Sequence, residues 1–174
     1  MYILGYNIDT KQFGFYLLKG VIPMGTSELT VADTQGNIVN LEDFKGEKLV
    51  LFFYPKANSS GCTNEVLAFK ELYDEFRKLG VAVLGISKDS VKAQKNFKEK
   101  YDLPFELLSD VEAKVCESYQ VLKEKSMYGK KYIGIERSTF VIDENLNIIK
   151  EYRNVKVKGH AEDVLEFLSQ MQGQ

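Results

Sequence analysis

The sequence predicts an α/β domain in which helices cover both faces of a mixed sheet. Two features support this prediction: patterns typical of buried strands alternate with helical patterns along the chain, and a hairpin followed by one helix closes it. The chain has 174 residues, of which 44% are hydrophobic and 28% charged, so it is long enough for one domain with a sizeable core.

Two short runs near the start, Glu28–Ala32 and Ile38–Leu41, flank the segment DTQGN. Gly36 and Asn37 in that segment are typical of a turn, so the two runs predict a β-hairpin. After the loop DFKGEK, the segment KLVLFFY at Lys48–Tyr54 is apolar throughout beyond its first residue. Such a pattern indicates a strand that is buried on both faces of a sheet.

The next elements alternate between helix and strand. Apolar residues at helical spacing predict a helix over Thr63–Leu79, and Gly80 is suited to end it. Val81–Ser87, with the sequence VAVLGIS, predicts a second buried strand. A helix over Ser90–Tyr101 follows, capped by its first residue or by Asp89.

The remaining elements complete the alternation. They are a short strand at Phe105–Leu108, a helix at Val111–Tyr119 capped by Asp110, paired strands at Ser138–Ile142 and Ile148–Tyr152, and a final helix at Gly159–Met171. The order of these elements, and above all the closing hairpin and helix, predicts a thioredoxin-like fold. The sequence contains neither internal repeats nor low-complexity linkers.

One cysteine stands at the junction of a predicted strand and a predicted helix. In FFYPKANSSGCTNE, Cys62 begins the helix, at the sheet edge where chemistry is usually found in α/β folds. The unpaired amides and the dipole of a first helical turn both favour thiolate over thiol. Pro55 is placed to end the strand and fix the loop, and the Ser59 hydroxyl is placed to bond the thiolate or an incoming oxygen.

Several cysteine chemistries can be weighed against these residues. A dithiol exchanger needs C-x-x-C, which the residues after Cys62 do not supply. A cysteine protease needs a histidine base, and we expect the only histidine, His160, to be a cap or surface residue. Two cysteines and one histidine far apart lack the spacing of a metal site. What remains is a thiolate activated by a dipole and a cation, which suits attack on a weak O–O bond and yields a sulfenic acid.

Composition limits the partners and the location. A net charge of −2 gives no reason to expect nucleic acid or an anionic membrane as partner, and no apolar run approaches the ~20 residues of a membrane span. Two cysteines do not form a disulfide scaffold, so we expect free thiols and a cytoplasmic location.

The first 23 residues form an aromatic-rich extension that polar residues interrupt, unlike a signal peptide. We expect residues 1–23 to be an added strand or hairpin, a poorly ordered arm, or a stretch upstream of a true start at Met24. The predicted domain is then 24–174.

Four stretches of the sequence resemble a known family. YPKANSSGCTNE resembles the P-x-x-x-[TS]-x-x-C motif of the peroxiredoxins, and GIERSTFVID resembles the stretch that holds their active-site arginine. KEKYDLPFELLSD and VKVKGHAEDVLEFL are similar to the bacterioferritin comigratory protein, or PrxQ, subfamily. The similarity runs from about Leu29 to Leu168, which is nearly the whole chain after the extension.

The resemblance implies a thiol peroxidase that reduces hydrogen peroxide and organic hydroperoxides. It makes Cys62 the nucleophile, Arg137 the cation that stabilises its thiolate, Ser59 a hydrogen-bond partner of the peroxide, and Pro55 a shield of the pocket. The implied reductant is thioredoxin or a low-molecular-weight thiol, no metal or haem is required, and the state is a monomer or a homodimer. Tyr54 and Glu65 are secondary candidates.

Three departures from the subfamily pattern affect the mechanism. Ser59 replaces the commoner threonine but keeps the hydroxyl, and Ser60 replaces a proline, which suggests a more mobile loop. Leu67 occupies the position where many members carry a resolving cysteine. The only other thiol is Cys116, which is either a structural residue or a resolving cysteine that would require the active-site helix to unwind. The competing function is a thioredoxin-fold binding or chaperone-like protein with weak peroxidase activity.

Overall fold

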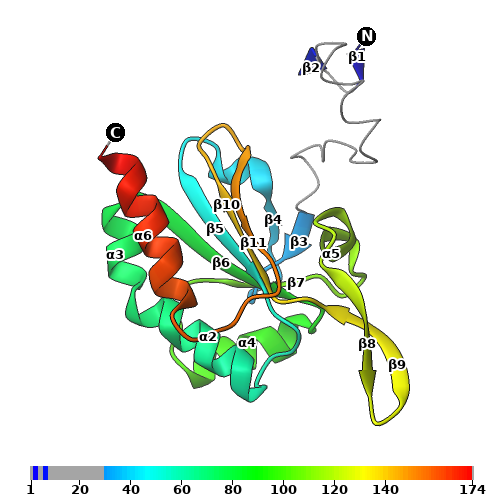
Figure 1. The fold of residues 1–174 in the computed structure, drawn as a ribbon. Helices are drawn as coiled ribbons and strands as arrows, with labels where there is room; N and C mark the ends of the chain where they lie inside the picture. The colour runs from blue at the N-terminus through cyan, green and yellow to red at the C-terminus, as the bar shows by residue number, and fades with distance from the viewer. Residues whose placement is uncertain (1, 4–5, 8–29, 174) are drawn as a thin grey trace.

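The computed structural model describes residues 2–3, 6–7 and 30–173. Its central sheet has seven strands in the order β11-β10-β5-β6-β7-β3-β4 (Figure 1). Strands β5, β6 and β7 run parallel, and the strands outside them pair antiparallel, so the predicted mixed sheet is confirmed. The bounds are β3 Thr30–Ala32, β4 Ile38–Asn40, β5 Lys48–Phe53, β6 Val81–Ser87, β7 Leu107–Ser109, β10 Ser138–Ile142 and β11 Ile148–Tyr152.

Helices cover both faces of the sheet, but unequally. Alternate residues of β5 point to opposite faces, so Leu51 and Phe53 enter one core cluster while Val50 and Phe52 enter the other. Four helices pack in the cluster of Phe52, and one short helix with a 3-10 turn packs in the cluster of Phe53 (Figure 1). The first group is α2 Ser60–Glu71, α3 Tyr73–Lys78, α4 Val91–Lys100 and α6 His160–Gln172; the second is η2 Leu41–Phe44 and α5 Lys114–Ser118.

Two predicted helices differ in extent from those in the structure. The single helix expected over Thr63–Leu79 is divided, because the backbone of Leu72 (φ −96°, ψ 3°) leaves helical geometry between α2 and α3. Gly80, with φ +71°, ends α3 as predicted. The helix expected over Val111–Tyr119 begins only at α5, because Ala113 is left-handed with φ +59°.

The structure contains a second hairpin that the sequence patterns do not predict. Strand β8, Leu122–Met127, pairs antiparallel with β9, Lys130–Ile135, in a separate two-stranded sheet. Tyr128 and Gly129 join the strands, and both have positive φ, as a tight two-residue turn requires. Most of its residues are exposed, so no alternation of buried and exposed side chains marks these strands.

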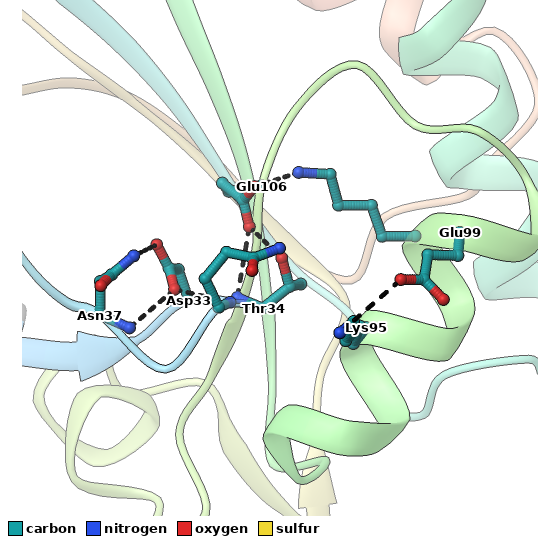
Figure 2. Close-up of polar contacts among 8 residues, drawn as sticks. Asp33, Thr34, Asn37, Lys95, Glu99 and Glu106 are labelled. Carbon is teal, nitrogen blue, oxygen red and sulfur yellow. Dashed lines mark hydrogen bonds and ion pairs between the residues drawn. The ribbon is translucent and has the colours of Figure 1, made fainter.

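The predicted first hairpin is confirmed for β3 and β4, and polar contacts fasten its turn to the domain. Figure 2 shows Glu106 between this turn and α4. The Thr34 hydroxyl donates to Glu106 Oε2 at 2.7 Å, and Lys98 forms an ion pair with the other carboxylate oxygen. Asp33 closes the turn by accepting from the backbone N–H of Asn37 at 2.9 Å. Glu28 and Leu29, which the prediction also placed in the first strand, lie outside the described residues.

The structure describes only four residues of the predicted N-terminal extension. They form β1, Tyr2–Ile3, paired antiparallel with β2, Tyr6–Asn7. The rest of the predicted extension lies outside the described residues. Within the described part of the chain, no helix combines the length and the apolar character needed to cross a membrane.

Candidate active site

Cys62 lies in the first turn of α2 and is fully buried. Ser59 is the N-cap: its backbone is extended (φ −69°, ψ 152°), and its carbonyl oxygen accepts from Thr63 N at 2.9 Å. The apolar strand β5 therefore ends in a short loop that delivers the thiol to the positive end of a 12-residue helix. The structure confirms the predicted strand–loop–helix setting of this cysteine.

Arg137 reaches this thiol from a distant part of the chain. It lies between β9 and β10, 75 residues from Cys62, and its Nη2 donates to Cys62 Sγ at 3.4 Å. Its Nη1 donates to Glu65 Oε2 at 3.3 Å, and its carbonyl oxygen accepts from Val155 N at 3.0 Å. A Cβ placed on Gly61 would stand 3.1 Å from Arg137 Nη2, so the absence of a side chain there lets the guanidinium lie close to the helix.

Glu65 is the buried carboxylate of the site. Its side chain is 2% exposed, and Oε1 has no hydrogen-bond partner among the described residues. Burial raises the pKa of Glu65 to about 7, against the opposing effect of the Arg137 guanidinium. Glu65 lies three residues after Cys62, which puts both on one side of α2. A single guanidinium thus joins a thiol to a carboxylate.

Pro55 and Ser59 lie in the loop between β5 and α2, and both are half-buried. Pro55 follows directly after Tyr54, where it stands at the end of the strand as predicted. The hydroxyl of Ser59 donates to the carbonyl oxygen of Lys56 at 3.0 Å. The predicted contact of Ser59 with a bound oxygen therefore requires this hydroxyl to turn from Lys56 toward the substrate.

A buried polar network holds the loop between β5 and α2. The Tyr54 hydroxyl donates to Gln94 Oε1, and Gln94 Nε2 donates to Ser87 Oγ at 2.8 Å. Ser87 Oγ donates to Asp89 Oδ2 at 2.6 Å, and the same carboxylate oxygen accepts from the N–H of Ala57 at 2.8 Å. This network is not evident from the sequence, because its polar residues lie on a strand, a loop and a helix that only the fold brings together.

Cys116, the second thiol, lies on the other side of the sheet. It is buried in the cluster of Phe53, whereas Cys62 is buried in the cluster of Phe52. Its N–H donates to Asp110 Oδ2 at 2.7 Å, and burial with the nearby carboxylate raises the pKa of the Cys116 thiol far above its usual range. Both cysteines are free.

His160 is neither the cap nor the surface residue that we expected, because Gly159 is the N-cap of α6 and the histidine is buried. It is the first residue of α6 and only 5% exposed, and its Nε2 lies 2.7 Å from Thr139 Oγ1. The rings of Phe69 and Tyr152 meet it edge-on, and burial lowers the pKa of His160 to about 4. The histidine is therefore a neutral core residue at neutral pH.

Comparison with known proteins places this chain in a family. A sequence model described as the AhpC/TSA family matches residues 25–151, and the chain belongs to that family. The chain is 50% identical over 136 residues to a putative peroxiredoxin bcp of Coxiella burnetii, a match that covers 78% of this chain and 90% of the relative. It is 44% identical over 144 residues to the peroxiredoxin Bcp of Bacillus subtilis, covering 83% and 92%.

Solved structures agree with the sequence relatives. A structure of the Xanthomonas campestris bacterioferritin comigratory protein, from work on its alkyl peroxide reduction activity, superposes with a TM-score of 0.81 at 41% identity and covers 86% of this chain and 96% of that one. A cysteine-to-serine mutant of PrxQ from Xylella fastidiosa gives a TM-score of 0.81 at 39% identity, covering 87% and 94%. The predicted thioredoxin-like fold and the resemblance to the Bcp or PrxQ peroxiredoxins are both confirmed.

Proposed function

We propose that this chain is a thiol-dependent peroxidase in which Cys62 reduces hydrogen peroxide and organic hydroperoxides. The observation that carries this proposal is the contact of 3.4 Å between Arg137 Nη2 and a buried sulfur in the first turn of α2. A cation and a helix N-terminus both favour the thiolate, which is the reactive form of cysteine. The alkyl peroxide reduction described for the Xanthomonas relative supports including organic hydroperoxides among the substrates.

The chemistry moves one oxygen to sulfur. Cys62 Sγ attacks one peroxide oxygen, the O–O bond breaks, and the sulfur becomes a sulfenic acid. The second oxygen leaves with the electron pair of that bond and takes up a proton, which gives water or an alcohol. Negative charge thus passes from sulfur to the leaving oxygen, and the guanidinium of Arg137 is placed to stabilise it at both ends. Pro55 limits water access, and the Ser59 hydroxyl bonds the peroxide.

Glu65 acts as a positioning residue in this proposal. Its Oε2 accepts from Arg137 Nη1 at 3.3 Å, while Nη2 of the same guanidinium faces the sulfur. Because the carboxylate is buried, the guanidinium is held in one orientation before substrate arrives. Glu65 does not touch the reacting atoms through any of these contacts.

The oxidised cysteine is reduced from outside the chain. Cys62 and Cys116 point into core clusters on opposite faces of the sheet, so their sulfurs cannot join while the sheet and α2 are intact. An external thiol condenses with the sulfenic acid, which releases water and leaves a mixed disulfide. A second thiol then frees Cys62. Thioredoxin or a low-molecular-weight thiol supplies these electrons, and two free cysteines suit a reducing compartment such as the cytoplasm.

A peroxide-consumption assay with dithiothreitol tests the proposal. The wild type and Cys116→Ser should consume peroxide, and Cys62→Ser should not, because only Cys62 is activated. The Cys116→Ser variant is the matched control, since it also removes one buried thiol. Equal consumption by the wild type and by Cys62→Ser would reject the peroxidase and favour a thioredoxin-fold binding protein.

A further inference from the structure

An external reductant needs a surface beside Cys62, and the hairpin β8–β9 provides one. Strand β9 ends at Ile135, two residues before Arg137, so the hairpin leads directly into the active site. Lys88, which follows β6, donates to the carbonyl oxygen of Ile133 at 3.1 Å and fastens the hairpin to the domain. Figure 1 shows β8 and β9 projecting from the body of the domain.

The register of the hairpin separates its side chains into two faces. Directly opposite residues share a face, and the face alternates along each strand. One face, called here the Lys125 face, carries three cross-strand pairs: Lys123 with Gly134, Lys125 with Tyr132, and Met127 with Lys130. The other face carries Leu122 with Ile135, Glu124 with Ile133, and Ser126 with Lys131.

The Lys125 face is basic and partly apolar. Met127 is 57% exposed and Tyr132 is 44% exposed, and they stand among three lysines; none of the residues paired on that face, all of them described, carries a carboxylate. On the other face, Lys131 pairs with Glu124 at 3.2 Å, which offsets its charge. A free-standing two-stranded hairpin gains little stability by itself, and grouped exposed apolar side chains mark an interaction surface. The chain as a whole has a net charge of −2, so this positive face stands out.

The side chain of Lys125 reaches the base of the hairpin, two residues before Arg137. The Lys125 ammonium donates to the carbonyl oxygen of Ile135, near the junction with Arg137. Its pKa is lowered, first by burial and then by the positive charge of Arg137, while Cys62 and the carboxylate of Glu136 act in the opposite sense. The ammonium therefore lies within electrostatic reach of both active-site residues.

We propose that the Lys125 face docks an acidic protein that carries the reducing thiol, an inference that rests on the proposed function. Negative charge on the partner meets the three lysines, and the exposed Met127 and Tyr132 supply apolar contact. The docked partner's thiol condenses with the Cys62 sulfenic acid and releases water. A second thiol of the partner then attacks the partner's sulfur in the mixed disulfide. Cys62 leaves as a thiolate, and the partner dithiol is oxidised to a disulfide.

Two adjacent lysines provide a matched test. Lys130 and Lys131 are both exposed, but only Lys130 lies on the Lys125 face. The probe is a thioredoxin of net negative charge, recycled by its reductase and NADPH, with dithiothreitol as the small-molecule reference. We expect Lys130→Glu to raise the KM for thioredoxin about threefold, and Lys123→Glu with Lys130→Glu about tenfold, with dithiothreitol turnover unchanged. Lys131→Glu should have less than half the effect of Lys130→Glu.

Several results would overturn the docking proposal. Equal effects of Lys130→Glu and Lys131→Glu would show that the KM for thioredoxin depends on the net charge of the protein and not on the Lys125 face. An unchanged KM in the double variant, or turnover with glutathione but not with thioredoxin, would also reject it. Added salt should raise the wild-type KM for thioredoxin and flatten the difference between variants. Failure of the wild type with dithiothreitol would instead overturn the proposed peroxidase function, and the docking proposal with it.

Discussion

Glu65 should make an unusual contribution to the pH dependence of stability, which a comparison with a non-titrating variant reveals. Its pKa in the folded state is raised from 4.5 to about 7, because the carboxyl group is buried. At pH values below 4.5 both the folded and the unfolded chain hold this proton, so the ionisation of Glu65 does not lower the free energy of unfolding there. As pH rises toward 7, the unfolded chain ionises more readily than the folded one. The stability associated with the neutral carboxyl group is therefore lost between these two pH values.

The expected magnitude follows from the shift. Each pKa unit corresponds to 1.36 kcal/mol, so a rise from 4.5 to about 7 is worth about 3 kcal/mol. Buried His160 works in the opposite direction. Its folded-state pKa is lowered from 6.5 to about 4, so it destabilises the folded chain by about 3 kcal/mol as pH falls through that range. The two groups largely cancel in the wild type.

Chemical denaturation of the wild type and Glu65→Gln separates the two groups. Glutamine keeps an acceptor for Arg137 but does not titrate. The contribution of His160 cancels in the difference between the two proteins. We expect the free energy of unfolding of the wild type, relative to Glu65→Gln, to decrease by about 3 kcal/mol from pH 4.5 to pH 7. A difference that stays constant across this range would refute the burial of a titrating carboxyl group at this position.

Substitutions at three further positions test the residues that support the site. Arg137→Met should lower kcat/KM for peroxide about 100-fold or more in competition kinetics, because it removes the donor to Cys62 Sγ, and Arg137→Lys should fall between it and the wild type. Gly61→Ala should displace the guanidinium, which lies 3.1 Å from the new Cβ, and lower kcat/KM about tenfold. Its denaturation midpoint should not fall, because alanine favours helix. Asp89→Ala leaves Ser87 and Ala57 without their acceptor and should cost about 2–4 kcal/mol in urea denaturation, with partial recovery in Asp89→Asn. Full activity of Arg137→Met would contradict the first expectation, wild-type kinetics of Gly61→Ala the second, and wild-type stability of Asp89→Ala the third.

The sequence was sufficient to predict the strands that are buried on both faces of the sheet. Strands β5 and β6 are buried on both faces, so their apolar runs identified them. The break between α2 and α3 was missed because Phe69 and Phe76, on either side of it, enter the same core cluster and continue the helical spacing. The hairpin β8–β9 was missed for the opposite reason, because few of its side chains are buried.

The site was predictable to a similar degree. The motif around Cys62 and the stretch around Arg137 led to two residues that the fold brings within 3.4 Å of each other. The sequence leaves the role of Cys116 open, because no periodicity reveals which face of the sheet a short helix will cover. The contacts of Asp89 and Gln94 needed the structure, since they depend on how the loop after β6 and helix α4 meet the end of β5 in space.

The central claim is that Cys62 alone is oxidised by peroxide and that no disulfide forms within the chain. The most direct measurement treats the reduced wild type with one equivalent of hydrogen peroxide and follows the intact mass. Because Cys62 has no second thiol of the chain within reach, the protein should gain the mass of one oxygen. A sulfenic-acid reagent should then label the peptide that contains Cys62 and not the one that contains Cys116. A loss of two hydrogens, with these two peptides joined, would contradict the account.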